Sequence, residues 1–329
     1  MLKEGRSQLG PDSSQDAQTV SQLGEFGLID RVTAGRAQSS GTVLGPGDDA
    51  AVLAAPDGRV VATTDVLVEQ VHFRLDWSTP HQVGRKAVAV NLSDIAAMGA
   101  VPTGLLVGLG CSPELPTNVA DELLDGMWEE AQQVGISIIG GDMVTAASLT
   151  ISVTALGDLQ GRPPVTRAGA RPGDVVAVAG RLGWSAAGLA VLGRGFRSPV
   201  AVVGAHRVPE PPYSAGPQAA LAGATAMVDT SDGLLADLGH IAAASQVAVD
   251  VRTEQVEVPQ RLTEVASALG ADARHWVLTG GEDQALVATF PAGHPLPEGW
   301  REIGVVAEGS GVTVDGAEYQ GPSGWEHWR

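Results

Sequence analysis

Seven aspartates lie inside or directly beside apolar stretches of this chain, where a carboxylate needs a cationic partner to stay charged. They are Asp48, Asp49, Asp65, Asp94, Asp142, Asp229 and Asp232. Hydroxyl residues accompany two of them: Thr63 and Thr64 precede Asp65, and Ser231 precedes Asp232. Mg²⁺ is a hard ion that takes carboxylate and hydroxyl oxygens together with substrate phosphates. The pattern therefore indicates carboxylates that converge on Mg²⁺ ions carrying a nucleotide, and hence a phosphotransferase.

Two elements are expected to position three of these groups. The stretch 60–68 is rich in β-branched residues and predicts a strand, whose alternation puts Thr63 and Asp65 on one face and Thr64 on the other. Residues 79–98 predict a helix, because Thr-Pro is a favourable helix start and a glycine follows its end. Asp94 sits among alanine, leucine and isoleucine in that helix, so its carboxylate needs a partner.

Each acidic motif also has a purely structural interpretation. A Gly-Asp-Asp sequence is usually a turn, Asp232 or Ser231 is usually a helix cap, and the Gly-Gly-Glu-Asp sequence at 280–283 is usually a loop. Their joint occurrence, rather than any one motif, favours the metal-binding interpretation.

Other phosphate-binding and catalytic motifs do not fit this chain. Lys3 and Lys86 are the only lysines, and neither follows the glycine loop of a Walker motif. The Gly45-x-Gly47-x-x-Ala50 segment has Asp48 and Asp49 where a dinucleotide pyrophosphate would lie. There is neither a Gly-x-Ser-x-Gly elbow nor a zinc-type spacing of histidine and cysteine.

The composition limits the class of protein. A length of 329 residues suggests two domains, and a net charge of −18 argues against nucleic acid or an anionic membrane as a partner. Cys111 is the only cysteine, which favours a reducing compartment. We find no apolar signal-peptide core and no apolar run long enough for a membrane span, so a cytoplasmic location is expected.

The order of elements predicts a mixed α+β or α/β fold. We expect a disordered tail over 1–20, an N-terminal α/β domain over 21–160 and a C-terminal α/β domain over 161–329, with a Pro/Gly/Arg-rich connector at 157–173. In the first domain, helices are expected at 21–33, 79–98 and 118–134, and strands at 60–68, 101–109, 136–139 and 149–156. In the second, strands are expected at 174–179, 226–228, 247–251 and 285–290, helices at 185–192 and 259–269 and after Gly233, and irregular structure at 194–218.

The combined motifs resemble thiamine-monophosphate kinase, within the aminoimidazole-ribonucleotide-synthetase-like ATP-binding superfamily. The resemblance rests on segments 47–51, 63–65 with His72-Phe73, 89–99, 140–142, 229–234 and 280–283, and it extends in order over residues 23 to 329. It implies a two-domain synthetase-like fold in which the N-terminal sheets of two subunits pair across a homodimer. It also implies an active site along the cleft between the domains, and ATP and Mg²⁺ as co-substrate and cofactor.

The resemblance implies a role for each matching residue. Mg²⁺ ligands would be Asp49, Thr63, Thr64, Asp65, Asp94, Asp142, Asp229 and Asp232. ATP would contact Gly141, Asp142, Arg167 and Ser231, and thiamine monophosphate would contact His72, Glu282 and Trp325. Asp142, Asp232 and Arg167 would act in catalysis. His72 can alternatively be a surface histidine at a strand end, and Trp325 a core residue.

The implied reaction is direct in-line transfer of the γ-phosphate of ATP to thiamine monophosphate, which gives thiamine diphosphate. A phosphate monoester has a second pKa near 6, so the acceptor oxygen is already anionic and needs no general base. Two positions depart from the family pattern. Gln284 follows the Gly-Gly-Glu-Asp motif where tyrosine is frequent, and Met143 follows Asp142 where threonine is frequent.

Two alternatives stay open. The chain could be another ATP-dependent synthetase of the same superfamily, although selenophosphate synthetase and the hydrogenase-maturation enzyme each use a reactive cysteine that this sequence lacks at the corresponding place. It could also be a nucleotide-binding regulator without turnover, which would be expected to lose some of the metal-binding aspartates.

Overall fold

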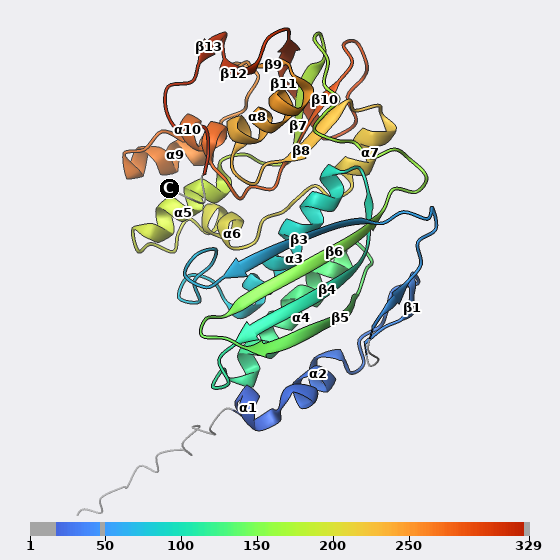
Figure 1. Ribbon diagram of the computed structural model, residues 1–329. Coiled ribbons are helices and arrows are strands. Elements are labelled where there is room, and N and C mark those ends of the chain that lie inside the picture. The colour runs from blue at the N-terminus through green and yellow to red at the C-terminus, as the bar shows by residue number, and fades with distance from the viewer. Residues whose placement is uncertain (1–17, 47–49, 326–329) are drawn as a thin grey trace, which may run out of the picture.

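The computed structural model describes residues 18–46 and 50–325, which form a mixed α/β structure with two main sheets (Figure 1). A four-stranded sheet belongs to the N-terminal half of the chain and a seven-stranded sheet to the C-terminal half. The expected α+β or α/β class is confirmed. The domain boundary near residue 160 stays a prediction. The chain passes from one sheet to the other between residues 158 and 175.

The N-terminal sheet has the order β3-β6-β4-β5, with β3 (Val61–Val68), β6 (Thr150–Asp158), β4 (Val101–Cys111) and β5 (Ile138–Thr145). β6 is antiparallel to both β3 and β4, whereas β4 and β5 are parallel. Helices α3 (Pro80–Ala97) and α4 (Thr117–Gln133) cover one face, which we call the helix face (Figure 1). Alternating residues such as Leu105, Val107 and Leu109 are buried against these helices.

The opposite face of this sheet, here called the open face, leaves large apolar side chains exposed. Val66 is 47 %, Leu106 37 % and Val144 57 % exposed. The remaining N-terminal elements are α1 (Val20–Leu23), α2 (Glu25–Thr33), β1 (Thr42–Leu44) and β2 (Val52–Leu53). An apolar sheet face of this extent is unusual for a monomer and is typical of an interaction surface.

Helix α3 begins as the sequence predicts and lies between the two sheets. Thr79 and Gln82 form a capping box around Pro80 at the first turn. Close packing on α4 depends on Gly84, where a Cβ atom would lie 1.9 Å from the carbonyl oxygen of Leu123. The far end of α3 packs its buried alanines against the seven-stranded sheet. A polar residue on α3 can therefore reach both halves of the molecule.

The C-terminal sheet has the order β13-β12-β9-β11-β7-β10-β8. Its strands are β7 (Val175–Ala179), β8 (Ala226–Asp229), β9 (Ala248–Val251), β10 (Leu286–Phe290), β11 (Trp300–Ala307), β12 (Gly311–Val314) and β13 (Ala317–Glu318). Its helices are α5 (Trp184–Gly193), α6 (Val200–Arg207), α7 (Ala215–Leu221), α8 (Leu234–Ser245), α9 (Gln260–Leu269) and α10 (Ala273–Thr279). Val176 and Val178 of β7 pack on one side, against α5, α6 and α8, and Ala177 and Ala179 pack on the other, toward α3 and α7.

Three expectations about elements are wrong. The helix expected over 21–33 is divided at Gly24, whose φ of +77° interrupts it. The segment expected to be irregular contains α6 and α7. Pro199 is at the N-cap of α6 and Pro217 is in the first turn of α7, and a helix tolerates proline at both positions. The strand expected at 136–139 begins later and continues through Asp142 to Thr145. The tail expected over 1–20 lies outside the described residues except at its end, where Val20 begins α1. Among the described residues, no helix combines the length and apolar character that a membrane crossing needs.

Candidate active site

A cavity of about 540 Å³ lies where α3, β3 and β8 meet the connector between the two sheets. Each of these four segments contributes polar residues to its lining, which are Thr63, Asp94, Thr166, Arg167 and Asp229. Residues that are 166 positions apart in the chain thus face one space. Two of the seven aspartates singled out in the sequence, Asp94 and Asp229, therefore meet at this cavity.

The β3–α3 side of the cavity is a hydrogen-bonded unit. The Thr63 hydroxyl donates to Asp94 Oδ2 over 2.7 Å, and the side-chain oxygen of Asn91 accepts from the backbone N–H of Asp65 over 2.9 Å. The Thr63 side chain uses the helix face of β3, as the alternation of this strand predicts, whereas Asp65 contributes its backbone N–H. The strand and the helix therefore hold Thr63 and Asp94 in fixed positions relative to each other.

The β8 side contributes a fully buried carboxylate. Asp229 is 3 % exposed, and its Oδ2 accepts a hydrogen bond of 2.8 Å from the hydroxyl of Ser93 on α3. The sequence reasoning missed Ser93. The signal was available, because a serine directly before Asp94 in an apolar helix also needs a partner.

The electrostatics of the cavity favour a bound cation. Burial raises the pKa of Asp94 to about 6, the Asp65 charge adds to the shift, and the Thr63 hydroxyl and Arg167 oppose it. Burial and the charge of Asp94 raise the pKa of Asp229 well above its usual range. Carboxyl groups this close are costly to ionise together unless a positive charge lies between them. These oxygens are also the ligands that Mg²⁺ prefers, so the donor set fits that ion.

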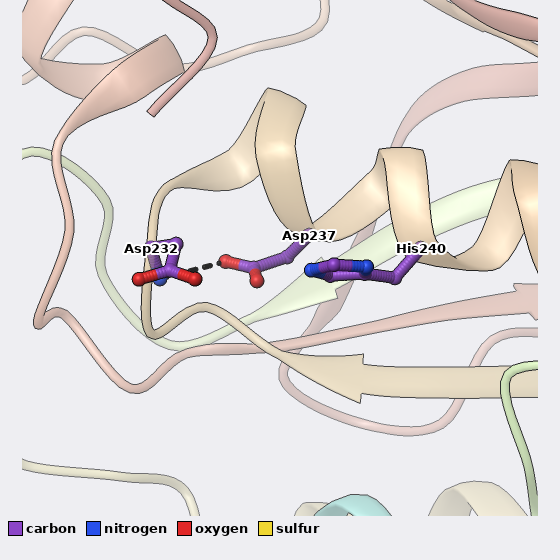
Figure 2. A group of neighbouring side chains, drawn as sticks. All are labelled: Asp232, Asp237 and His240. Carbon is purple, nitrogen blue, oxygen red and sulfur yellow. Dashed lines mark hydrogen bonds between the residues drawn. The ribbon is translucent and has the colours of Figure 1, made fainter. Parts of the chain in front are cut away.

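A second group of possible metal ligands lies at the start of α8 (Figure 2). Ligand atoms of Asp232, Asp237 and His240 lie within 4.8 Å of one another. Asp237 Oδ2 also accepts from the backbone N–H of Asp232, over 3.1 Å, and of Gly233, over 3.0 Å. Asp237 therefore fixes the turn that presents Asp232, and Gly233 is at the N-cap of α8. The N-cap position is therefore held by Gly233 rather than by Ser231 or Asp232.

Asp237 is a buried carboxyl that the sequence reasoning missed. Burial raises its pKa to about 7, although the two backbone N–H groups lower it. An aspartate in the first turn of a helix was the available signal, because that position favours a carboxylate.

The Gly-Gly-Glu-Asp segment is a loop that lies against this turn. The backbone N–H of Glu282 donates to Ser231 O over 2.8 Å, and that of Gln284 donates to Thr230 O over 3.1 Å. The backbone N–H of Trp325 donates to Asp232 O over 2.9 Å. The structure therefore brings Ser231, Asp232, Glu282 and Trp325 together. Trp325 is 63 % exposed, which argues against its alternative interpretation as a core residue.

Glu282 and His72 also lie close together. The ammonium group of Lys86 donates to Glu282 Oε1 and to the backbone carbonyl of His72. Burial alone would raise the pKa of Glu282. The positive charge of Lys86, together with His206 and His72, has the larger effect and holds the pKa below its ordinary value. The side chain of His72 accepts at Nδ1 from the backbone N–H of Val68, which fixes the ring after β3. The sequence reasoning did not assign Lys86 a role.

Three expected site residues lie elsewhere. Thr64 and Asp142 are on the open face, where Thr64 Oγ1 donates to the carbonyl of Val153 and Asp142 pairs in register with Gly108. Asp142 is on the edge strand β5, three strands away from β3, which corresponds to about 14 Å. Gly141 lies beside it. Asp49 falls outside the described residues.

The structure shows the local surroundings of Gly141 and of the two residues that depart from the family pattern, Met143 and Gln284. A Cβ atom at Gly141 would lie 2.0 Å from the carbonyl oxygen of Val107, so the pairing of β5 with β4 requires glycine there. Met143 packs against the N-terminal core. Gln284, the other departure from the family pattern, is 4 % exposed with φ of +53°.

Comparison with known proteins gives a consistent result. Residues 47–159 match the family model described as "AIR synthase related protein, N-terminal domain". Thiamine-monophosphate kinase of Mycobacterium tuberculosis is 52 % identical, over 94 % of this chain and 93 % of that protein, and the enzyme of Corynebacterium glutamicum is 41 % identical over 96 % of each. The solved structure "AaThiL complexed with AMPPCP and TMP" superimposes with a TM-score of 0.79 at 32 % identity, over 95 % of this chain and 100 % of that one. The expected resemblance is confirmed, and the chain belongs to the thiamine-monophosphate kinase family.

Proposed function

We propose that this protein transfers the γ-phosphate of ATP directly to the phosphate of thiamine monophosphate, with Mg²⁺ as cofactor. The observation that carries the proposal is the convergence of Thr63, Asp94, Arg167 and Asp229 on one cavity between the two sheets. A structural relative complexed with AMPPCP and TMP supports the choice of ATP and thiamine monophosphate. The identity of 52 % to a thiamine-monophosphate kinase supports the same choice.

Residues of the cavity and of the segments beside it would bind Mg²⁺ and ATP. Thr63, Asp65, Asp94, Asp229 and Asp232 would hold Mg²⁺, which supplies positive charge to the phosphates when it is bound. Arg167 lines the same cavity and adds a fixed positive charge. Ser231 would contact ATP from the neighbouring turn.

The acceptor needs alignment rather than proton removal. Its phosphate oxygen is already anionic at neutral pH, because the second pKa of a phosphate monoester is near 6. We assign the thiamine moiety to the region of His72, Glu282 and Trp325. The carboxylate of Glu282 and the exposed indole of Trp325 suit a cationic thiazolium ring, through charge and cation–π contacts. Asp232, a proposed Mg²⁺ ligand, lies next to Trp325.

We also propose that the working unit is a homodimer formed through the open face. Val66, Leu106 and Val144 are exposed there, and a second copy would bury them. In that arrangement Thr64 and Asp142 would face the partner subunit, and Gly141 would lie beside Asp142 on β5. Their proposed contacts with Mg²⁺ or ATP would then depend on assembly. The cytoplasmic location stays a prediction, supported by the single buried Cys111.

The test is a direct assay of both products. Purified protein is incubated with Mg-ATP and thiamine monophosphate, and ADP and thiamine diphosphate are measured by chromatography. We expect the two products in equal amounts, and neither when EDTA replaces Mg²⁺. Consumption of ATP with aminoimidazole-pathway substrates but not with thiamine monophosphate would contradict the proposal and favour another synthetase of the superfamily.

A further inference from the structure

Helix α3 contacts the C-terminal half through two polar residues on the same side. Lys86 and Ser93 are seven residues apart, which is two helical turns. Lys86 reaches Glu282 and Ser93 reaches Asp229, and both partners belong to the C-terminal half. One helix thus carries a link to the proposed thiamine site near its start and a link to the carboxylate cavity near its end.

The ammonium group of Lys86 is placed between two substrate-binding segments. Its side chain is 4 % exposed. Nζ donates to Glu282 Oε1 over 2.8 Å and to the carbonyl oxygen of His72 over 2.9 Å. A buried ammonium group is stable only when its donors are paired, so Lys86 holds both segments in place.

The loop that carries Glu282 has an unfavourable backbone conformation. Glu282 has φ of +63° and Gln284 φ of +53°, a region that residues with a side chain rarely adopt. Asp283, between them, accepts hydrogen bonds from the backbone N–H groups of Gly183 and Ser185 at the start of α5. A conformation of this kind persists only when surrounding contacts impose it. Lys86 supplies such a contact from the opposite half of the molecule.

We propose that Lys86 is a positioning residue for thiamine monophosphate. By fixing Glu282 and the His72 segment to α3, it sets the distance between the thiamine-binding end of the site and the carboxylate cavity. Asp94 is eight residues further along the same helix, about 12 Å. This inference rests on the proposed function and adds a role that composition and motif matching do not assign.

The test compares Lys86→Gln, Lys86→Arg and a control, Arg85→Gln. Arg85 is the neighbouring residue on α3, and its guanidinium Nε donates to buried Glu130 over 2.7 Å, away from the thiamine site. We expect Lys86→Gln to raise the KM for thiamine monophosphate by about tenfold or more, because it removes a charge-assisted contact to Glu282. The KM for ATP is expected to change less than about twofold. Lys86→Arg is expected to recover part of the loss, and Arg85→Gln to leave the KM for thiamine monophosphate unchanged.

A second measurement covers the case in which Lys86→Gln folds poorly. Lys86→Met retains the apolar stem, and calorimetric titration with thiamine monophosphate in the absence of ATP reports binding without turnover. In a Glu282→Gln background, we expect Lys86→Met to weaken binding much less than in the wild-type background, because its main partner is already altered. An equal loss in both backgrounds, or an unchanged KM in a folded Lys86 variant, would overturn the inference. If the wild-type protein does not phosphorylate thiamine monophosphate, the proposed function fails independently of any Lys86 variant.

Discussion

The two faces of the four-stranded sheet carry similar polar groups in different surroundings. On the helix face, Thr63 bonds to Asp94 of α3 and lines the cavity shared with β8, and the backbone N–H of Asp65 bonds to Asn91 of α3. On the open face, Thr64 and Asp142 lie among exposed apolar side chains. The helix face is completed by the chain itself. In the proposed homodimer, a second molecule would give the open face comparable surroundings. The acidic residues of a sequence therefore do not by themselves tell a site within one subunit from a site shared between two.

Removing a carboxylate on the helix face is expected to have the largest effect. Asp94→Asn keeps the shape of the side chain but loses a charge that we assign to Mg²⁺ binding, so kcat is expected to fall by about 10²–10³-fold. In the absence of Mg²⁺ its Tm is expected to equal or exceed that of the wild type, because the substitution removes a buried carboxyl with a raised pKa. Full turnover by this variant would remove the metal-binding argument. Assays at saturating Mg-ATP and thermal scans of both proteins measure the two effects.

Disrupting the open face tests whether activity depends on a dimer formed through it. Leu106→Glu puts a charge in the middle of the exposed apolar surface, and we expect the protein to elute as a monomer and kcat to fall by about tenfold or more. Light scattering coupled to size exclusion, with assays of the same fractions, measures both. The control is Leu189→Glu on α5, where leucine is 44 % exposed away from the sheet. An active monomer of the Leu106 variant would show that the helix face is sufficient.

The raised pKa values of Asp94, beside the helix face, and of Asp237 on α8 predict a pH-dependent effect of Mg²⁺. The pKa of Asp94 is raised to about 6 and that of Asp237 to about 7, above the ordinary value near 4. The folded metal-free protein therefore binds more protons than the unfolded chain in this range, and its free energy of unfolding falls as the pH rises from about 4 to about 7. Mg²⁺ competes with these protons, so the gain in Tm on adding Mg²⁺ is expected to be larger at pH 8 than at pH 5. An equal gain in Tm at both pH values would show that Mg²⁺ does not bind at these carboxyl groups.

The smallest effect on kcat is expected for substitutions of Asp237. Two variants distinguish its role in supporting the backbone from the role of its charge. Both backbone N–H groups bond to the same oxygen, Oδ2, so Asp237→Asn can keep them, and kcat is expected to stay within about threefold. Asp237→Ala loses both contacts and is expected to lower stability by about 1–2 kcal/mol. Denaturant unfolding and kinetics on the pair measure this difference. A loss in the Asn variant as large as that in Asp94→Asn would make Asp237 a metal ligand.

Local patterns predicted much of what positions the site. The Thr-Pro start of α3, the β-branched strand β3 and its alternation all follow from nearest-neighbour geometry, and the structure agrees with them. The prediction was wrong for β5 because the glycines at 140 and 141 suggest a turn. Gly141 instead allows β4 to approach closely, a requirement that only the neighbouring strand reveals.

The sequence by itself determined the family of this protein and the acidic and hydroxyl groups available for its chemistry. It also determined which face of β3 carries Thr63 and Asp65 and which carries Thr64. These depend on residue type and on a backbone period that extends over a few residues. The tertiary structure decided which groups meet, because contacts such as Ser93–Asp229 and Lys86–Glu282 join residues more than 130 positions apart. Strand order and the packing of α3 between the two sheets create these contacts, and neither is encoded in a local pattern. For the same reason Asp142, a full member of the motif set, lies on the other face of the sheet.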